Sequence, residues 1–447
     1  MAQDLPTPTP WPLTRLPSGG TMRRVIGNGC VERNTKRRRR VAVHILFADA
    51  FHHDHADALR DRGHDCTFAP HLTADDLPDA VTGMDVLVVR STRVTSTTIA
   101  AADTLGMIIR AGAGTNTIDK EEAAGRGIYV CNVPGRNAIA VAELAFALMA
   151  ALDRNIPDNV ADLRAGTWNK KRYADAGGLY GRAVGVVGLG DIGLAFAERA
   201  AAFGMRVHAV ARPGRAPDVL TRTERAGVTF LDDLPTLAAT CDVLSFHVPL
   251  TDDTRAMVDV DLLRHMRPGA WIINTSRGEI IDDDALLDAI HDKDLRAGLD
   301  VHNGEPSSST GTFDSLLAQH PNVYGTHHIG ASTEQAQRAI AAEVVAMLDA
   351  YERGEIRNCV NIESQPVGNA TLVIRHLDEV GVLSDVLNVL RQCELNIEQM
   401  SNTIFAGRTA AVATIHTSGS TPDDLTERLN AVDRVLHASM RNVGNGT

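Results

Sequence analysis

The sequence predicts an α/β protein with two lobes, each built on a doubly wound parallel sheet, followed by a small α+β domain. Two series of short apolar, β-branched runs separated by helical stretches carry this prediction, one starting at residue 41 and one at residue 184. Such alternation is typical of parallel sheets with helices on both faces. The last eighty or so residues instead read β-α-β-β-α-β, which indicates a separate ferredoxin-like domain. A chain of 447 residues has room for these two or three domains.

The elements of the first series are the runs at 41–49, 85–91, 107–112 and 128–134. An apolar segment at 140–152 follows; it is too short to span a bilayer and predicts a buried helix. The second series has its runs at 183–190, 205–212, 228–231, 242–248, 270–276 and 296–301. A helix at 334–355 and a loop at 361–369 precede the final domain. Two successive sheets predict a cleft between lobes, where ligands tend to bind.

Composition narrows the class of partner. The net charge of −12 disfavours nucleic acid or an anionic membrane as the main partner. The six cysteines include no CxxC pair, which favours reduced thiols in a cytoplasmic protein over a disulfide framework or a metal site. Residues 1–40 are rich in proline and end in the basic run 36–40. We interpret them as a disordered extension, with a basic tail or targeting address as the alternative.

A glycine cluster opens the second series. Gly188, Gly190 and Gly193 form a G-x-G-x-x-G pattern between a predicted strand and a predicted helix at 192–203. The first glycine permits a tight turn, the second lets the backbone approach a pyrophosphate, and the third allows close helix packing. Free N–H groups at the helix N-terminus would bind the phosphates. The pattern therefore predicts a dinucleotide-binding lobe.

The stretch AVARPGR at 209–215 bears on which dinucleotide is bound. A strand at this distance from the glycines usually ends on an acid that binds the adenosine ribose. Ala211 occupies that place and Arg212 follows it. Without a carboxylate to repel a 2′-phosphate, Arg212 or Arg215 could pair with one, which favours NADP. The alternative is that both arginines are solvated and NAD binds through backbone contacts.

Three segments that follow predicted strands carry residues suited to hydride transfer. They contain Arg277, then Asp300 and Glu305, then His328, and would meet at one sheet edge. A guanidinium can bind a carboxylate bidentately, and an imidazole can exchange the proton of a hydroxyl near neutral pH. A carboxylate bonded to the other imidazole nitrogen fixes its tautomer.

Together these motifs resemble the D-isomer-specific 2-hydroxyacid dehydrogenases, over residues 41–447. The resemblance rests on the segments at 88–95, 110–119, 132–144, 186–193, 274–278, 299–306 and 328–333. It implies that Arg277, Glu305 and His328 are catalytic and that Asp300 touches the nicotinamide carboxamide. It also implies substrate binding by Arg277, Arg90 and the backbone at Ala113 and Gly114. The candidate cofactor-binding residues are Gly188, Gly190, Asp191, Ile192, Gly193, Arg212, Thr275 and Asp300.

The resemblance also implies a domain plan and a substrate. Residues 41–140 and 329–360 would form the substrate-binding domain, and 141–328 the dinucleotide-binding domain. Residues 368–447 are similar to an ACT domain, an amino-acid-sensing module of many such enzymes. The chain looks most like family members that oxidise 3-phosphoglycerate to 3-phosphohydroxypyruvate in serine synthesis, and we expect a homodimer or homotetramer. The basic residues that suit a phosphorylated acid are Arg90, Arg93, Arg136, Lys170 and Lys171.

Three departures from the family pattern leave alternatives open. His327 replaces the usual proline before the catalytic histidine; we interpret it as a packed loop residue, with an exchange of roles with His328 as the alternative. Asp378 and Val380 replace the asparagine and proline of the effector loop. The acid would repel an amino acid's carboxylate and attract its ammonium group, so serine binding is in question and a purely dimerising role stays open.

Two other functions also stay open. One is a hydroxypyruvate or glyoxylate reductase of the same family, which NADP preference would favour. The other is a cofactor-sensing binding protein like the corepressors that share this fold; turnover would distinguish it.

Overall fold

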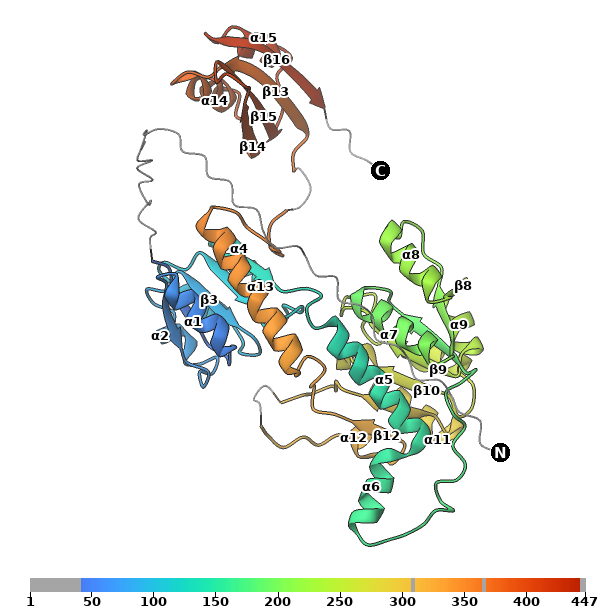
Figure 1. The fold of residues 1–447 in the computed structure, drawn as a ribbon. Coiled ribbons are helices and arrows are strands. Elements are labelled where there is room, and N and C mark those ends of the chain that lie inside the picture. Colours follow the sequence, from blue (N-terminus) through green and yellow to red (C-terminus); the bar gives the residue numbers. More distant parts are fainter. Residues whose placement is uncertain (1–41, 307–309, 364–366, 443–447) are drawn as a thin grey trace, which may run out of the picture. The chain divides into compact units, whose positions relative to one another are not determined.

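A computed structural model describes residues 42–306, 310–363 and 367–442 of the chain (Figure 1). The predicted extension at 1–40 and the last residues of the predicted final domain, 443–447, lie outside the described residues. None of the helices in the described part is long and apolar enough to cross a membrane.

The first sheet contains five parallel strands in the order β2-β1-β3-β4-β5. The strands are β1 (His44–Phe47), β2 (Asp65–Phe68), β3 (Val86–Val89), β4 (Met107–Arg110) and β5 (Tyr129–Asn132). The helices between them are α1 (His53–Asp61), α2 (Leu77–Ala80), α3 (Ser96–Ala101) and α4 (Lys120–Gly125). All four residues of β3 are buried, because helices cover both faces of a parallel sheet.

A helix from much later in the chain completes this first core. In α13 (Glu334–Glu352), Ile340 and Val344 are buried in one cluster with Ile45 of β1 and Val86 of β3. Figure 1 shows α13, in orange, beside the blue helices and strands of the first sheet. The chain therefore leaves the first sheet after β5 and returns to it after the second sheet.

The second sheet contains seven parallel strands in the order β12-β11-β10-β9-β6-β7-β8. The strands are β6 (Ala183–Val187), β7 (Arg206–Val210), β8 (Thr229–Leu231), β9 (Val243–Phe246), β10 (Trp271–Asn274), β11 (Arg296–Leu299) and β12 (Val323–Gly325). Separate clusters pack on its two faces, so the sheet is doubly wound.

Helices α5 (Ala138–Arg154) and α7 (Asp191–Ala202) cover one face, and the buried residues of α5 confirm the helix predicted at 140–152. On the other face lie α9 (Leu234–Thr240), α10 (Val260–His265) and α11 (Asp283–Lys293). The remaining short elements are α6 (Ile156–Arg164), α8 (Pro217–Arg225), η1 (Gly278–Ile280) and α12 (Leu316–Gln319).

The C-terminal domain has the predicted β-α-β-β-α-β order. Its elements are β13 (Ala370–Leu377), α14 (Val382–Gln392), β14 (Asn396–Ile404), β15 (Ala410–Ser418), α15 (Leu425–Asn430) and β16 (Val435–Asn442). The strands form an antiparallel sheet in the order β14-β15-β13-β16, and both helices contribute to one buried core. The predicted fold class is confirmed: two doubly wound parallel sheets and a ferredoxin-like domain.

Candidate active site

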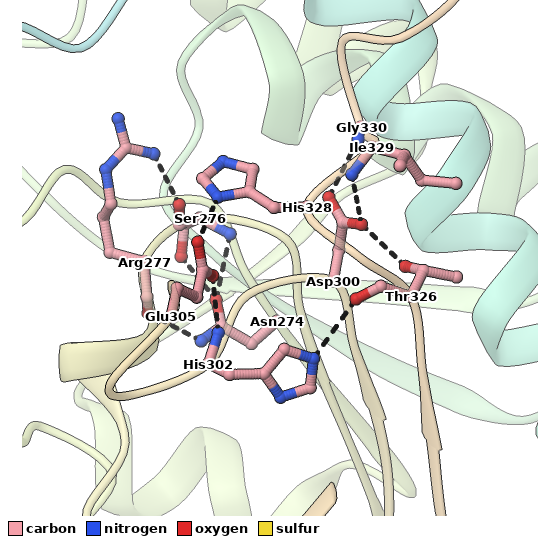
Figure 2. A network of polar contacts seen from close by, with 10 residues as sticks. All are labelled: Asn274, Ser276, Arg277, Asp300, His302, Glu305, Thr326, His328, Ile329 and Gly330. Carbon is pink, nitrogen blue, oxygen red and sulfur yellow. Dashed lines mark hydrogen bonds and ion pairs between the residues drawn. The ribbon is translucent and has the colours of Figure 1, made fainter. Parts of the chain in front are cut away.

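The candidate catalytic residues follow three neighbouring strands of the second sheet. Arg277 comes after β10, Asp300 directly after β11, and His328 after β12. Because carboxyl ends of parallel strands meet at the same sheet edge, the three segments converge there. Figure 2 shows their side chains around one network of polar contacts.

His328 and Glu305 form the centre of this network. The Nδ1 of His328 lies 2.7 Å from Oε2 of Glu305, and Oε1 accepts a 2.8 Å hydrogen bond from the backbone N–H of His302 (Figure 2). A carboxylate can only accept here, so Nδ1 carries the proton and Nε2 is the nitrogen that can take one up. The pair is thus arranged for general acid–base chemistry at Nε2.

Opposing effects act on the Glu305 carboxyl. Burial favours its neutral form, but the hydrogen bond and charge of His328, with the N–H of His302, outweigh burial, so its pKa lies below the ordinary value. Glu305 therefore stays ionised beside the imidazole across the neutral range.

A buried asparagine shapes the turn that carries Arg277. Asn274, the last residue of β10, donates a 2.8 Å hydrogen bond to the carbonyl of Arg277 and accepts two from Ser276, one from the N–H and one from the hydroxyl. Arg277 itself donates to the carbonyl of Ser276 at 2.6 Å. Burial lowers the pKa of Arg277, and the nearby Glu279 and Glu305 oppose that effect. Sequence reasoning missed Asn274, although an asparagine closing a fully buried apolar strand was a usable signal.

Asp300 is almost completely buried and holds the loop that carries His328. Its Oδ1 accepts hydrogen bonds from the Thr326 hydroxyl at 2.6 Å and the Ile329 N–H at 2.8 Å, while Oδ2 accepts from the Gly330 N–H at 2.8 Å (Figure 2). The carbonyl of Asp300 also accepts from the N–H of His328. Within this loop His328 has a left-handed backbone, with φ of 51°. Four bonds from one residue therefore maintain a conformation that a histidine seldom adopts.

Two further arginines lie with Arg277. Arg90 follows β3 and its Nη2 donates to the hydroxyl of Ser332 at 3.2 Å. Arg110 ends β4, and burial together with the charges of Arg277 and Arg90 lowers its pKa to about 10. The three guanidinium groups form what we call the arginine group. Sequence reasoning missed Arg110, although it begins one of the family-like segments.

Glycines in the loop after β4 make room for this arginine group. A Cβ atom on Gly112 would overlap the guanidinium of Arg110, and one on Gly114 would overlap that of Arg277. The carbonyl of Ala113, between them, accepts a 2.6 Å bond from Asn132. The predicted substrate-binding residues Arg90, Ala113, Gly114 and Arg277 thus belong to adjoining segments.

The other basic residues predicted to suit a phosphorylated acid are either paired with a carboxylate or exposed. Arg136 pairs with the buried Glu343 of α13 at 2.6 Å, so it is committed to a structural ion pair. Arg93 is exposed, and so are Lys170 and Lys171 in the loop after α6. That loop is tied to the helices before it, since Arg172 pairs with Asp162 of α6. Neither lysine is among the charges that act on Arg90, Arg110 or Arg277.

The interpretation of His327 as a packed residue is wrong, because its side chain is exposed. Asp300 binds Thr326 on one side and the backbone of residues 328–330 on the other, so the loop is fixed without any packing of the residue at 327.

The glycine motif lines a cavity of about 670 Å³ at the carboxyl ends of β6, β7 and β9. Gly188 has φ of 96° and a Cβ on Gly193 would overlap its carbonyl oxygen, so both positions require glycine. The Cα of Gly190, in contrast, faces open space. Asp191 and Ile192 start the following helix α7, where unpaired N–H groups can bind an anion.

These residues fit a dinucleotide cofactor. The open face of Gly190 allows close backbone approach of a pyrophosphate. The hydroxyl of Thr275, beside the active site, is buried and lacks a hydrogen-bond partner among the described residues, so it can serve a ligand.

The loop after β7 lines the same cavity with Ala211, Arg212 and Arg215. Arg215 donates to the carbonyls of Val210 and Arg212 and lies over the ring of Phe230. Arg212 is exposed at the cavity. Of the two arginines, Arg212 is the one whose guanidinium is not engaged in holding the loop.

The lowered pKa of Glu305 predicts how its contribution to stability depends on pH. A carboxyl whose pKa is depressed by folding stabilises the fold above its unfolded pKa, and that contribution is lost as pH falls through the folded pKa. We expect Glu305→Gln to be less stable than the parent protein near pH 7, with the difference shrinking as pH falls below about 4.5, the ordinary pKa of a glutamate. Urea midpoints of both proteins across this range provide the measurement.

In a His328→Ala background the same comparison should show a smaller pH dependence, because a main cause of the lowered pKa is then absent. A stability difference that stays constant with pH would contradict this account of Glu305.

Comparison with known proteins supports a family assignment. Residues 146–330 match the family model described as "D-isomer specific 2-hydroxyacid dehydrogenase, NAD binding domain". The chain is 40% identical over 328 residues to D-3-phosphoglycerate dehydrogenase of Methanocaldococcus jannaschii, covering 72% of this chain and 60% of that enzyme. It is also 40% identical over 277 residues to hydroxypyruvate reductase of Thermotoga maritima, covering 62% of this chain and 87% of that enzyme.

Among solved structures, D-lactate dehydrogenase from Aquifex aeolicus, complexed with NAD and lactic acid, superimposes with a TM-score of 0.61 at 25% identity. The match covers 72% of this chain and all of that enzyme. The two parallel sheets, the glycine motif and the match at 40% identity over 87% of the T. maritima relative agree, and the chain belongs to the D-isomer-specific 2-hydroxyacid dehydrogenase family.

Proposed function

We propose that this protein is a nicotinamide-dependent dehydrogenase that interconverts 3-phosphoglycerate and 3-phosphohydroxypyruvate. The observation that carries the proposal is the His328–Glu305 pair beside a group of three arginines. One guanidinium can bind the substrate carboxylate, and the other two can bind a phosphate. An acid without a phosphate would leave those two guanidinium groups unpaired. The M. jannaschii relative supports this substrate, although the chain spans only 60% of its length.

Each residue of the site has its own role in the proposed reaction. Arg277 binds the carboxylate and polarises the neighbouring carbonyl, while Arg90 and Arg110 bind the phosphate, helped by the backbone at Ala113 and Gly114. A bound nicotinamide would supply the hydride acceptor for oxidation and the hydride donor for reduction. In oxidation, Nε2 of His328 accepts the C2 hydroxyl proton; in reduction it returns that proton to the C2 oxygen. Glu305 holds the imidazole and stabilises its charged form.

A hydroxypyruvate reductase is the second candidate, favoured by the T. maritima relative, of which the chain covers 87%. The two can be separated by turnover of 3-phosphohydroxypyruvate, hydroxypyruvate and glyoxylate, each with NADH and NADPH, followed by nicotinamide absorbance. We expect kcat/KM for the phosphorylated acid to exceed that for hydroxypyruvate. The reverse order would favour the reductase, and no turnover with any pair would favour a cofactor-sensing binding protein.

His328→Ala should reduce kcat at least about 10²-fold, because the residue that exchanges the substrate proton is lost. Cofactor binding, measured by fluorescence titration, should stay near normal. His327→Ala is the matched control, since it changes the exposed neighbour and should leave kcat nearly unchanged. Loss of activity in the control alone would transfer the proton-exchanging role to His327.

For the cofactor we propose Gly188, Gly190, Asp191, Ile192, Gly193, Arg212, Thr275 and Asp300 as binding residues, with a preference for NADP. Support comes from Arg212, exposed at the cavity beside Ala211, where a carboxylate would oppose a 2′-phosphate.

Ala211→Asp should therefore shift the ratio of kcat/KM for NADPH to that for NADH downward by about tenfold or more, through repulsion of the phosphate and binding of the ribose hydroxyls. Arg212→Ala should lower the ratio as well, by removing the attraction alone. An unchanged ratio in both variants would count against the NADP preference.

For assembly we propose a homodimer or homotetramer. Ile156, Val160 and Leu163 form an exposed apolar stripe on α6, and Trp168 and Tyr180 in the following loop are 82% and 88% exposed. Apolar side chains gathered in this way are typical of a subunit interface. For the C-terminal domain we propose an ACT-like role, supported by its β-α-β-β-α-β order. Asp378 in its loop would attract the ammonium group of an amino-acid effector and repel its carboxylate.

A further inference from the structure

Asp49, which sequence reasoning did not single out, lies where the first sheet divides. In the order β2-β1-β3-β4-β5, the connection from β1 leads to one side and that from β3 to the other. Ligands of open parallel sheets bind outside the carboxyl ends of strands at such a switch point. Asp49 follows β1 and faces the loop after β3, residues 90–92, which begins with Arg90 of the arginine group.

One carboxylate oxygen of Asp49 binds three successive N–H groups of that loop. Oδ2 accepts from the N–H of Arg90 at 2.6 Å and from those of Ser91 and Thr92 at 3.1 Å each. Oδ1 accepts from the Ser91 hydroxyl at 2.8 Å. Consecutive backbone N–H groups that converge in this way form an anion-binding concavity. Here the anion is a side chain of the protein itself.

This arrangement has two consequences for a bound acid. The three N–H groups are engaged, so recognition of the substrate at this edge is left to side chains. The main chain of Arg90 is also held at its N–H, while its guanidinium donates to Ser332, four residues beyond His328. Asp49 thus fixes the backbone of Arg90, whose side chain links the first sheet to the loop that carries His328.

The charge of Asp49 acts on the arginine group as well. Burial lowers the pKa of both Arg90 and Arg110, and Asp49 opposes this effect at each of them. For Arg277, Glu279 and Glu305 are the opposing carboxylates. Asp49 is therefore the carboxylate that compensates the positive charge on the first-sheet side of the group.

We propose that Asp49 is a positioning residue for substrate binding, which sets the loop 90–92 and Arg90 so that the arginine group can bind the phosphorylated acid. The inference rests on the proposed function, because it assigns to Arg90 a role in binding the substrate.

Asp49→Ala removes all four hydrogen bonds, and Asp49→Asn keeps an oxygen in place but removes the charge. We expect KM for 3-phosphohydroxypyruvate to rise about tenfold or more in the alanine variant and about threefold in the asparagine variant, because charge-assisted bonds are lost or weakened. The change in kcat should be smaller than the change in KM. Cofactor affinity, measured by fluorescence titration, should be unchanged because the cofactor cavity belongs to the second sheet.

Asp85→Asn is the matched control. Asp85 also binds a backbone N–H within the first sheet, that of His44 at 2.9 Å, but it precedes β3 and so lies at the opposite edge. The control makes the same change of charge and should leave KM at the parent value. A purely structural role for Asp49 would lower thermal stability and the active fraction, but would leave the KM of the active molecules unchanged.

The possible results distinguish a failure of the role proposed for Asp49 from a failure of the proposed function. An unchanged KM in both Asp49 variants of an active enzyme would overturn the inference and leave the proposed function standing. If the alanine variant does not fold, the asparagine variant decides alone, and a KM equal to that of Asp85→Asn overturns the inference. Failure of the parent protein to turn over any of the three oxo acids would instead overturn the proposed function, and this inference with it.

Discussion

The rest of the site depends on the hydrogen bonds between Asp300 and the loop after β12. A histidine with a left-handed backbone is strained, and such conformations persist only where surrounding contacts determine them. Asp300 supplies those contacts through its carboxylate and its carbonyl. With the loop fixed, the imidazole of His328 meets Glu305, and the hydroxyl of Ser332 meets Arg90. One buried carboxylate thus sets the positions of several side chains of the candidate site.

In the arginine group, positive charges that lie close together are balanced by nearby carboxylates. Burial lowers the pKa of Arg110, and repulsion by the positive charges of Arg277 and Arg90 lowers it further. Carboxylates offset this repulsion, Asp49 at Arg90 and Arg110, and Glu279 and Glu305 at Arg277. An anionic substrate would add the charge that the group lacks.

Much of the fold could be predicted from the sequence, because apolar runs and the glycine motif are local signals. The strand β2 was not predicted, because it is a short edge strand whose four residues alternate in burial and form no apolar run. Within the site, Arg277, Glu305 and His328 lie in recognisable segments. Arg110, Asn274 and Asp49 went unnoticed because their importance comes from which strand ends become neighbours. The same limit explains His327, whose exposure depends on bonds made by Asp300 rather than on its own neighbours in the sequence.

The return of the chain to its first sheet has a consequence for biosynthesis. The core of that sheet is closed by Ile340 and Val344 of α13, which emerge from the ribosome only after the whole second sheet has been made. The second sheet and its helices, in contrast, form from one continuous stretch of chain. The nucleotide-binding part can thus fold while the first sheet still waits, with an exposed apolar face, for its last helix. During this interval the apolar face that α13 will cover is exposed, and exposed apolar surface on a partly folded chain favours aggregation.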